Sequence, residues 1–186
     1  MRTDFRPFPT LRTERLVLRQ PRPSDAERNF VLRTDERTMA YIGRPRPGTV
    51  QEAAAMLEQL EQDRVAGTRL GWIIALRDDD AMIGSIGLYK LRPEHALAEV
   101  GYQLMHDNWG KGLMREALHA VVAFAFEQLG AHRVEAMTDP RNERSRALLE
   151  RCGFTLEGIL RESYYWEGGF LGTAVYGRLQ RDGSPA

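Results

Sequence analysis

A short glycine-containing segment is the part of this sequence whose residue types most clearly indicate chemistry. Asn108-Trp109-Gly110-Lys111-Gly112-Leu113-Met114 follows a strand-like run, 97–105, and opens a long apolar helix pattern. The first amide groups of a helix have no intrahelical partner, and the helix dipole favours an anion beside them. Two glycines let a ligand approach the backbone without an intervening Cβ atom. The segment therefore predicts a binding site for a molecule that carries phosphates.

Two familiar phosphate-binding sequences are excluded by the residues around these glycines. A P-loop requires Ser or Thr after Gly-Lys, whereas Gly112 follows Lys111 here. The dinucleotide-binding fingerprint requires a third glycine three residues after the second, and Arg115 occupies that position. Gly-x-Gly alone is weak evidence, because a plain turn before a helix would have the same sequence.

A second motif further along the chain makes the signal specific. Asn142-x-x-Ser145 leads into Cys152-Gly153-Phe154. Asn142 is also a good helix N-cap and Ser145 a tolerable first-turn residue, so a purely structural role is the competing interpretation. The block 99–154 nevertheless resembles the acetyl-CoA-binding core of the GNAT superfamily of N-acetyltransferases. The ends of the chain are most similar to the branch that acetylates the N-termini of ribosomal proteins.

The resemblance implies acetyl-CoA as a cosubstrate and no metal ion. It also implies backbone N–H groups near Leu104 and Met105 as the donors that stabilise the thioester oxygen. The cofactor-binding residues that it implies are Leu104, Met105, Asn108, Trp109, Gly110, Lys111, Gly112, Leu113, Met114, Asn142 and Ser145.

Acetyl transfer to an amine also requires a base and an acid. An amine is largely protonated at neutral pH, and the departing thiolate is a poor product unless it gains a proton. Glu99 lies in mid-strand among apolar neighbours, where a carboxylate is costly unless it is solvated or hydrogen-bonded. GNAT enzymes often place their base on this strand, so Glu99 is the candidate catalytic base. An exposed structural carboxylate is the alternative.

The acid is less conventional. Many GNAT enzymes protonate the thiolate from a Tyr seven residues after the motif Asn, but Leu149 stands there in this chain. The resemblance to the ribosomal branch implies Ser145 as the donor instead. Cys152 is interpreted as a buried structural thiol, because no His or Asn motif accompanies it.

The acceptor side is indicated by aromatic residues. Tyr164, Tyr165 and Trp166 lie in the segment 161–170, which we expect to connect the last two strands. With Tyr41 in the Pro- and Arg-rich loop 41–48, they are the candidate substrate-binding residues. Gly172 departs from the Asp that relatives tend to carry there.

The elements that must position these residues can be predicted from periodicity and caps. We expect strands over 11–20, 70–76, 82–91, 97–105, 133–138, 154–160 and 173–179, and helices over 25–33, 50–66, 111–129 and 143–151. Ser24-Asp25-Ala26-Glu27 and Thr49-Val50-Gln51-Glu52 are predicted capping boxes. This order implies, by resemblance, an α/β GNAT fold, with a mostly antiparallel sheet of about seven strands, about four helices and a splayed parallel pair at its centre.

Composition sets broad limits on the protein. The 186 residues suit one domain, 1–186, with a core over about 10–181. The net charge is zero, from 26 basic and 26 acidic residues, so nothing favours nucleic acid as a partner. One cysteine and the lack of a long apolar run or apolar signal region predict a cytoplasmic protein without membrane association.

The sequence thus predicts an acetyl-CoA-dependent N-acetyltransferase whose acceptor is the N-terminal amine of a protein, such as a ribosomal protein. Two alternatives stay open: an acetyltransferase for a small amine such as a polyamine, amino acid or aminoglycoside, and a GNAT-fold module that binds acyl-CoA without turnover. A homodimer is compatible with the resemblance.

Overall fold

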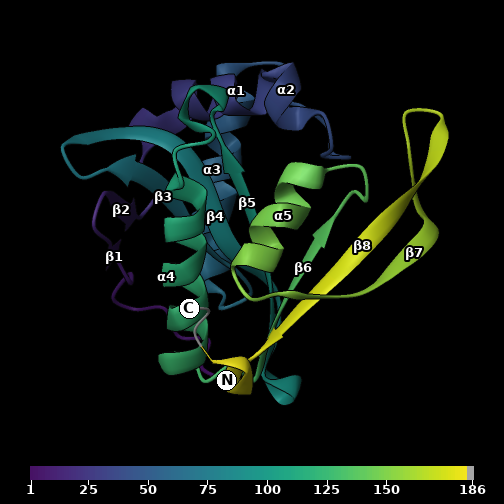
Figure 1. Cartoon of the computed structure of the whole chain (residues 1–186). Coiled ribbons are helices and arrows are strands. Elements are labelled where there is room, and N and C mark those ends of the chain that lie inside the picture. The colour runs from purple at the N-terminus through teal and green to yellow at the C-terminus, as the bar shows by residue number, and fades with distance from the viewer. Residues whose placement is uncertain (184–186) are drawn as a thin grey trace.

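Eight strands form one mixed sheet in the computed structural model, which describes residues 1–183 (Figure 1). The strands are β1 (Leu11–Arg12), β2 (Leu16–Arg19), β3 (Leu70–Leu76), β4 (Asp79–Arg92), β5 (Leu97–Leu104), β6 (Arg133–Thr138), β7 (Thr155–Trp166) and β8 (Gly169–Leu179). The helices are α1 (Ala26–Thr34), α2 (Glu36–Met39), α3 (Val50–Val65), α4 (Leu113–Glu127) and α5 (Glu143–Arg151). The α/β GNAT fold expected from the sequence is confirmed, with one strand and one short helix more than predicted.

The strand order is β1-β2-β3-β4-β5-β6-β8-β7, and β5 and β6 are the parallel neighbours in it. Their pairing runs from Leu97 opposite Arg133 to Val100 opposite Ala136. Beyond that point no described residue of β5 pairs with β6, while β5 stays paired with β4 as far as Leu104. Residues 101–104 therefore have β4 as a partner on one side and no partner strand on the β6 side, as the expected splayed pair requires. We call this part of β5 its unpaired segment.

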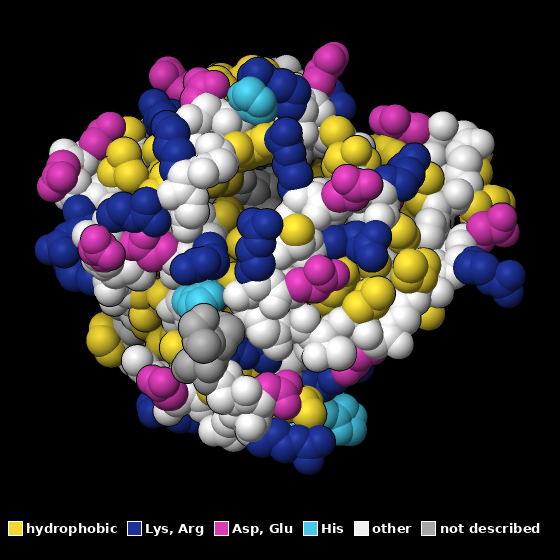
Figure 2. Space-filling view, in the orientation of Figure 1, with side chains coloured by type: hydrophobic (Ala, Val, Ile, Leu, Met, Phe, Trp, Pro, Cys, Tyr) yellow, Lys and Arg dark blue, Asp and Glu magenta, His cyan; other side chains and the backbone are white. Residues whose placement is uncertain are grey.

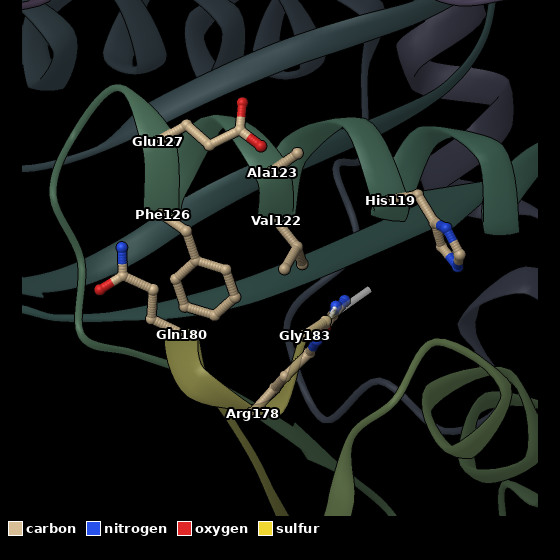
Figure 3. Close-up of a pocket in the computed structure, with 8 residues that line it drawn as sticks. All are labelled: His119, Val122, Ala123, Phe126, Glu127, Arg178, Gln180 and Gly183. Carbon is tan, nitrogen blue, oxygen red and sulfur yellow. Dashed lines mark hydrogen bonds between the residues drawn. The ribbon is translucent and has the colours of Figure 1, made fainter. Parts of the chain in front are cut away.

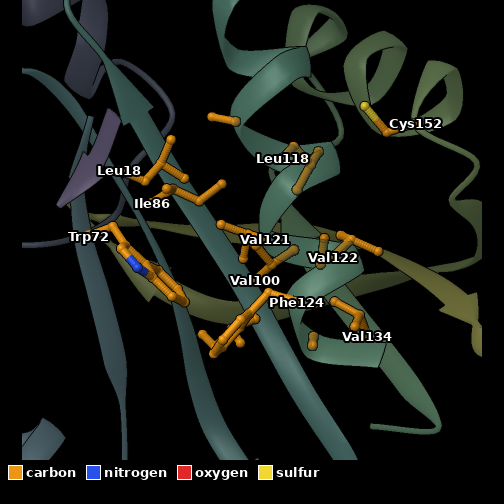
Figure 4. Packing of buried hydrophobic residues seen from close by; sticks show 14 of the residues in the cluster. Leu18, Trp72, Ile86, Val100, Leu118, Val121, Val122, Phe124, Val134 and Cys152 are labelled. Atoms are coloured by element: carbon orange, nitrogen blue, oxygen red, sulfur yellow. The ribbon is translucent and has the colours of Figure 1, made fainter. Parts of the chain in front are cut away.

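The helices cover the two faces of the sheet separately. Helix α4 packs on one face, and α1 and α3 pack on the other (Figure 1). Figure 4 shows Leu118, Val121 and Phe124 of α4 directed onto the strands. The rings of Trp72 and Phe124 meet edge to face with centroids 5.5 Å apart. Each large apolar side chain buried in this way contributes about 1.5–3 kcal/mol, so α4 and the glycine segment before it are firmly anchored.

The single N-terminal edge strand predicted over 11–20 is wrong. β1 and β2 are separate strands that pair antiparallel with each other. The turn between them is fixed by Thr13, whose hydroxyl accepts a hydrogen bond from the Leu16 N–H group at 3.0 Å. Alternation of leucine and charge could not distinguish one long strand from two short ones joined by a tight turn.

The capping box predicted at Ser24-Asp25-Ala26-Glu27 is also wrong. Asp25 makes no side-chain cap at the start of α1. Its carboxylate instead pairs with the buried Arg19 at 2.7 Å and accepts a hydrogen bond from the Arg22 N–H group at 2.8 Å. A buried guanidinium requires a buried counter-charge, and this requirement outweighs a local cap. Half of the second box forms: the Thr49 hydroxyl accepts from the Glu52 N–H group at 3.2 Å, but the Glu52 carboxylate accepts from the Gly48 N–H group at 2.8 Å and not from Thr49.

The last two strands are longer than predicted. β7 and β8 extend through most of 161–170 and are joined by Glu167 and Gly168, both with positive φ. A two-residue turn with this geometry suits the twist of a hairpin. The expected connection is therefore the distal part of the β7–β8 hairpin, which projects from the rest of the molecule (Figure 1).

Among residues 1–183, no helix has the length and apolar character needed to cross a membrane.

Candidate active site

The unpaired segment of β5 presents backbone amide groups to the side from which β6 has diverged. The Met105 N–H group donates to the Ile83 carbonyl at 2.9 Å, so it points toward β4. Because successive amide groups along a strand point in opposite directions, the N–H groups of Leu104 and Tyr102 point away from β4. Of the two amides expected to stabilise a thioester oxygen, the one at Leu104 is therefore available and the one at Met105 is not.

The glycine segment leaves a second set of amide groups available. Gly110 and Gly112 have φ angles of 73° and 75°, and a Cβ atom added at Gly110 would meet nothing within 4 Å. Among the described residues, no backbone hydrogen bond is donated by residues 110–113, which immediately precede and open α4. These open amides at a helix start fit the phosphates of coenzyme A.

Arg15 holds this segment in place from the turn between β1 and β2. Its guanidinium donates to the Lys111 carbonyl at 2.9 Å and to the Glu116 carboxylate at 2.7 Å. Thr13 also donates to Glu116. Burial opposes ionisation of Glu116, but the hydrogen bonds from Thr13 and Arg15 outweigh it and keep its pKa below the usual value. The glycine segment is thus fixed by residues from the opposite end of the chain.

Trp109 links the glycine segment to β5 and α5. Its indole Nε1 donates to the Leu104 carbonyl at 2.7 Å, and the Arg144 guanidinium lies 4.9 Å from the centre of its ring. The His106 ring packs beside it at 4.9 Å. Figure 2 shows Lys and Arg side chains gathered around a hollow between α4 and α5, a surface whose charge suits a phosphate-bearing ligand.

Ser145 lies where α5 approaches the unpaired segment of β5. The Asn142 side chain caps α5 by accepting a hydrogen bond from the Ser145 N–H group at 3.1 Å. The Ser145 hydroxyl is therefore not needed for capping, and its oxygen lies 2.9 Å from the Tyr102 hydroxyl. Leu149, at the position of the more usual Tyr, is fully buried in the core.

The surroundings of Tyr102 keep its hydroxyl protonated. Burial strongly raises the pKa of Tyr102, although the hydrogen bond with Ser145 partly opposes this shift. Cys152 is buried, and burial raises its pKa to about 11, so it is a neutral thiol at physiological pH. This agrees with the structural role predicted for Cys152.

Glu99 lies on the opposite face of β5 from Tyr102. Side chains alternate along a strand, and Gln103, which shares the face of Glu99, donates to the Met39 sulfur at 3.2 Å. One Glu99 carboxylate oxygen pairs with the Lys90 ammonium at 2.8 Å, and the Glu99 side chain is 13% exposed. Lys90 has a φ of 44° at a bulge of β4. The other carboxylate oxygen has no hydrogen-bond donor among the described residues.

A cavity of about 270 Å³ lies on this second face, between the loop that precedes α3 and the β7–β8 hairpin. Tyr41, Tyr164 and Trp166 line it together, as predicted from the sequence. Tyr165 does not, because its 61% exposed ring packs against Phe170 on the outside of the hairpin. Alternation along β7 separates Tyr165 from its two neighbours.

Another cavity, of about 300 Å³, lies between α4 and the end of β8 (Figure 3). His119, Phe126 and Arg178 line it, and none of the residues predicted to bind the cofactor or substrate does. The buried Nε2 atom of His119 has no hydrogen-bond partner among the described residues.

Tyr102 and Arg15 are site residues that sequence reasoning missed. Tyr102 has no motif signal of its own, although its position two residues before Leu104 places it on the cofactor-binding strand. Arg15 could not be recognised, because its partners Lys111 and Glu116 lie about a hundred residues further along the chain.

The fold is that of an acyltransferase family. Residues 15–155 match the family described as an acetyltransferase (GNAT) domain. The uncharacterized N-acetyltransferase YoaA of Bacillus subtilis is 34% identical over 169 residues, which cover 91% of this chain and 96% of that protein. The chain belongs to the GNAT family and is an acetyl-CoA-dependent N-acetyltransferase.

Two further proteins bear on the cofactor and the acceptor. RimL, a ribosomal alpha-N-protein acetyltransferase solved in complex with coenzyme A, superimposes with a TM-score of 0.84 at 20% identity, covering 92% of this chain and 98% of that one. The ribosomal-protein-serine acetyltransferase of Escherichia coli is 27% identical over 101 residues, or 54% of this chain and 56% of that protein.

Proposed function

We propose that the protein acetylates the N-terminal amine of a protein, and that a ribosomal protein is such an acceptor. One observation carries the proposal: the donor-side groups and the acceptor-side groups lie on opposite faces of the same strand. Tyr102 and Ser145 face the side of α4 and α5, where the glycine segment fits phosphates. Glu99 shares its face of β5 with Gln103, which contacts Met39 in the lining of the aromatic-lined cavity.

The known acceptors of similar proteins support a protein N-terminus. RimL and the serine acetyltransferase of Escherichia coli are described as acting on ribosomal proteins, although their identity to this chain is only 20% and 27%. A chain terminus is narrow and flexible, and the cavity between the loop 40–49 and the β7–β8 hairpin is flanked by Tyr41, Tyr164 and Trp166. Aromatic walls of this kind can pack on both sides of an extended backbone.

Acetyl-CoA supplies the acetyl group as a thioester, so the reaction exchanges a C–S bond for a C–N bond. Glu99 receives the proton that the ammonium loses, directly or through water, on the carboxylate oxygen that Lys90 does not hold. Lys90 keeps that carboxylate oriented. The N–H group of Leu104, which points away from β4, donates to the oxygen that gains negative charge.

The Ser145 hydroxyl holds the proton for the leaving sulfur on the other face. Tyr102 shares a hydrogen bond with Ser145 and can return a proton to it, because burial keeps the Tyr102 hydroxyl protonated. In this proposal the two hydroxyls together supply the acid that many GNAT enzymes have as a Tyr at the position of Leu149.

The proposal is tested by measuring thiol release from acetyl-CoA against a panel of N-terminal peptides and small amines. Peptides are expected to give higher kcat/KM than polyamines, free amino acids or aminoglycosides. A higher kcat/KM with a small amine than with any peptide would show that the acceptor is a small amine and not a protein N-terminus. Binding of acetyl-CoA without release of thiol on any acceptor would indicate a module that binds acyl-CoA without turnover.

A further inference from the structure

The acceptor cavity is lined by three arginines and two carboxylates. Asp139 is 4% exposed, and its carboxylate oxygens receive hydrogen bonds from the Arg141 side chain at 2.6 and 2.9 Å. These two charges therefore cancel locally. Arg44 and Arg46 remain, and neither forms an ion pair with any described residue, so the cavity has an excess of positive charge over the single exposed Glu167.

A further guanidinium, Arg33 of α1, is half-buried and lies close enough to Arg44, which lines this cavity, for the two charges to interact. No described carboxylate lies within ion-pair distance of Arg33, and its hydrogen bond to the Asn29 side chain is long, at 3.4 Å. Burial lowers the pKa of Arg33, and the positive charges of Arg69 and Arg44 lower it further, whereas Tyr89 opposes them.

Arg69 and Tyr89 lie close enough to Arg33 to affect its pKa. Arg69 stacks on the Tyr89 ring at 4.3 Å and has only a distant partner, Asp63, at 3.5 Å. Tyr89 lies opposite Glu99 in the β4–β5 ladder, and its ring covers Gly101. The acceptor face thus has a carboxylate at one end, suited to an ammonium, and a cluster of guanidiniums, suited to an anion.

Arg44 is exposed, but Arg33 is half-buried and has no ion-pair partner among the described residues, which is costly to the folded chain. Such a cost is offset when a ligand brings the missing anion, and Arg is well suited to hold a carboxylate through paired N–H groups. The arrangement is therefore better explained by a ligand charge than by stability.

We propose that the acceptor is an amine with a carboxylate close to it, and that Arg33 and Arg44 bind this carboxylate while Glu99 receives the amine. This inference rests on the proposed transfer to a protein N-terminus and specifies its class: an N-terminal segment with an acidic residue soon after the first position. Arg33 and Arg44 are then specificity-determining residues.

The first experiment compares matched, C-terminally amidated peptides. The acidic peptide Ser-Glu-Glu-Ala-Leu is expected to have a kcat/KM about tenfold or more above that of Ser-Gln-Gln-Ala-Leu, with most of the difference in KM. The basic counterpart Ser-Lys-Lys-Ala-Leu is expected to be poorer still. Free glutamate and glutamine form a second pair, which shows whether a small acid alone satisfies the site. Equal kcat/KM for the acidic and neutral peptides would overturn the proposal.

The second experiment uses variants of the arginines. Arg33→Gln and Arg44→Gln should each remove most of the preference for the acidic peptide, while the KM for acetyl-CoA stays close to that of the parent. Arg33→Gln should leave Tm unchanged or raise it, because it removes an unpaired charge. Arg151→Gln, an exposed change at the end of α5, is the matched control and should retain the preference. If Arg33→Gln or Arg44→Gln loses stability but keeps the preference for the acidic peptide, that arginine does not bind the acceptor carboxylate.

A binding measurement separates this inference from the proposed transfer. Trp166 lines the cavity, so its fluorescence can report occupancy by glutarate, with glutaramide as the neutral control and Trp166→Phe to identify the signal. Saturable binding of glutarate that Arg33→Gln abolishes supports the anion site even if no peptide is acetylated. Acetylation of peptides without charge preference and without glutarate binding overturns the anion site and leaves the transfer intact.

Discussion

The hydroxyl oxygens of Tyr102 and Ser145 lie 2.9 Å apart and connect β5 to the first turn of α5. Tyr102 lies on β5 two residues beyond its last pair with β6, and Ser145 lies on the helix that follows β6. Their hydrogen bond joins two proton-bearing groups beside the segment of β5 that has no partner on its β6 side, while Leu149 is a buried core side chain.

Replacing these hydroxyls tests their role as a proton donor. Ser145→Ala should lower kcat about 10- to 100-fold, because the leaving thiolate loses its acid. Tyr102→Phe should lower kcat less, since it removes only the partner of Ser145. In a double-mutant cycle the two effects should be strongly non-additive, because the groups act together. The measurement is steady-state acetyl transfer with a common acceptor.

Stability provides the control for this pair. The Asn142 cap of α5 uses the backbone of Ser145 and not its hydroxyl, so Ser145→Ala should unfold at nearly the parent temperature. Normal turnover by an unstable variant would show that the hydroxyl only supports α5.

Glu99→Gln tests the base. It keeps the size of the side chain and removes its basicity, so kcat/KM should fall about 10²-fold near neutral pH. Activity should recover partly at high pH, where free amine accumulates. The affinity for coenzyme A, measured by calorimetry, should not change, because Glu99 faces the acceptor side. If the pH–rate profile matches that of the parent enzyme, bulk water deprotonates the amine and Glu99 orients substrate.

The glycine segment can be tested with a control from the same chain. Gly110 and Gly130 both have positive φ, of 73° and 70°, and a Cβ atom at either would meet nothing within 4 Å. Valine at each position should therefore cost similar backbone strain. Gly110→Val should weaken coenzyme A binding at least about tenfold, from a Kd on the order of micromolar, because the ligand can no longer approach the backbone. Gly130→Val should bind coenzyme A as the parent does, and equal affinities for all three proteins would refute the assignment.

His119 predicts a pH dependence of stability. Burial lowers its pKa below the usual 6.5, and the charges of Arg178 and Arg115 lower it further. At a pH between the lowered pKa of His119 in the folded chain and its value of 6.5 in the unfolded chain, only the unfolded chain binds the proton. The stability that comes from keeping His119 neutral is therefore fully present above pH 6.5 and is lost as pH falls below that value.

Urea unfolding at pH 7.5 and 5.5 measures this loss. His119→Gln should narrow the difference in the free energy of unfolding between the two pH values, because glutamine does not titrate. His95→Gln, at an exposed histidine, is the control and should leave the difference unchanged. An equal pH response in the parent and in His119→Gln would place the loss elsewhere.

Much of the fold could be predicted because its signals are local. Periodicity identified α4, whose apolar residues lie on the sheet, and the cap at Thr49 marked the start of α3. The predictions failed where a distant residue decides. The cap predicted from Ser24 and Glu27 does not form where Asp25 pairs with the buried Arg19, and the hairpin extends β7 through residues whose sequence has no clean alternation.

The same distinction applies to the site. Glycines and a motif pair indicated the cofactor side, because the amides that they expose depend on local backbone. The contact between Tyr102 and Ser145 spans 43 positions, and that between Arg15 and Glu116 spans 101. Such contacts exist only once the sheet and helices are assembled, so no pattern in a single sequence could show them.

The divergence of β5 and β6 gives the sheet an edge in its interior. Sheet edges normally lie at the periphery, where water satisfies their amides, or are protected from pairing with other chains. Here the amides of Tyr102 and Leu104 lie two residues apart along the strand, which is about 6.6 Å. An extended ligand whose carbonyl groups have a similar spacing could accept a hydrogen bond from each. Coenzyme A bound there would act as a short additional strand and join the two halves of the sheet. The melting temperature should then rise with coenzyme A concentration. At a concentration a hundredfold above Kd, the free energy of unfolding should increase by about 2.7 kcal/mol. Bound in this way, the cosubstrate would also be a structural component of the sheet that binds it.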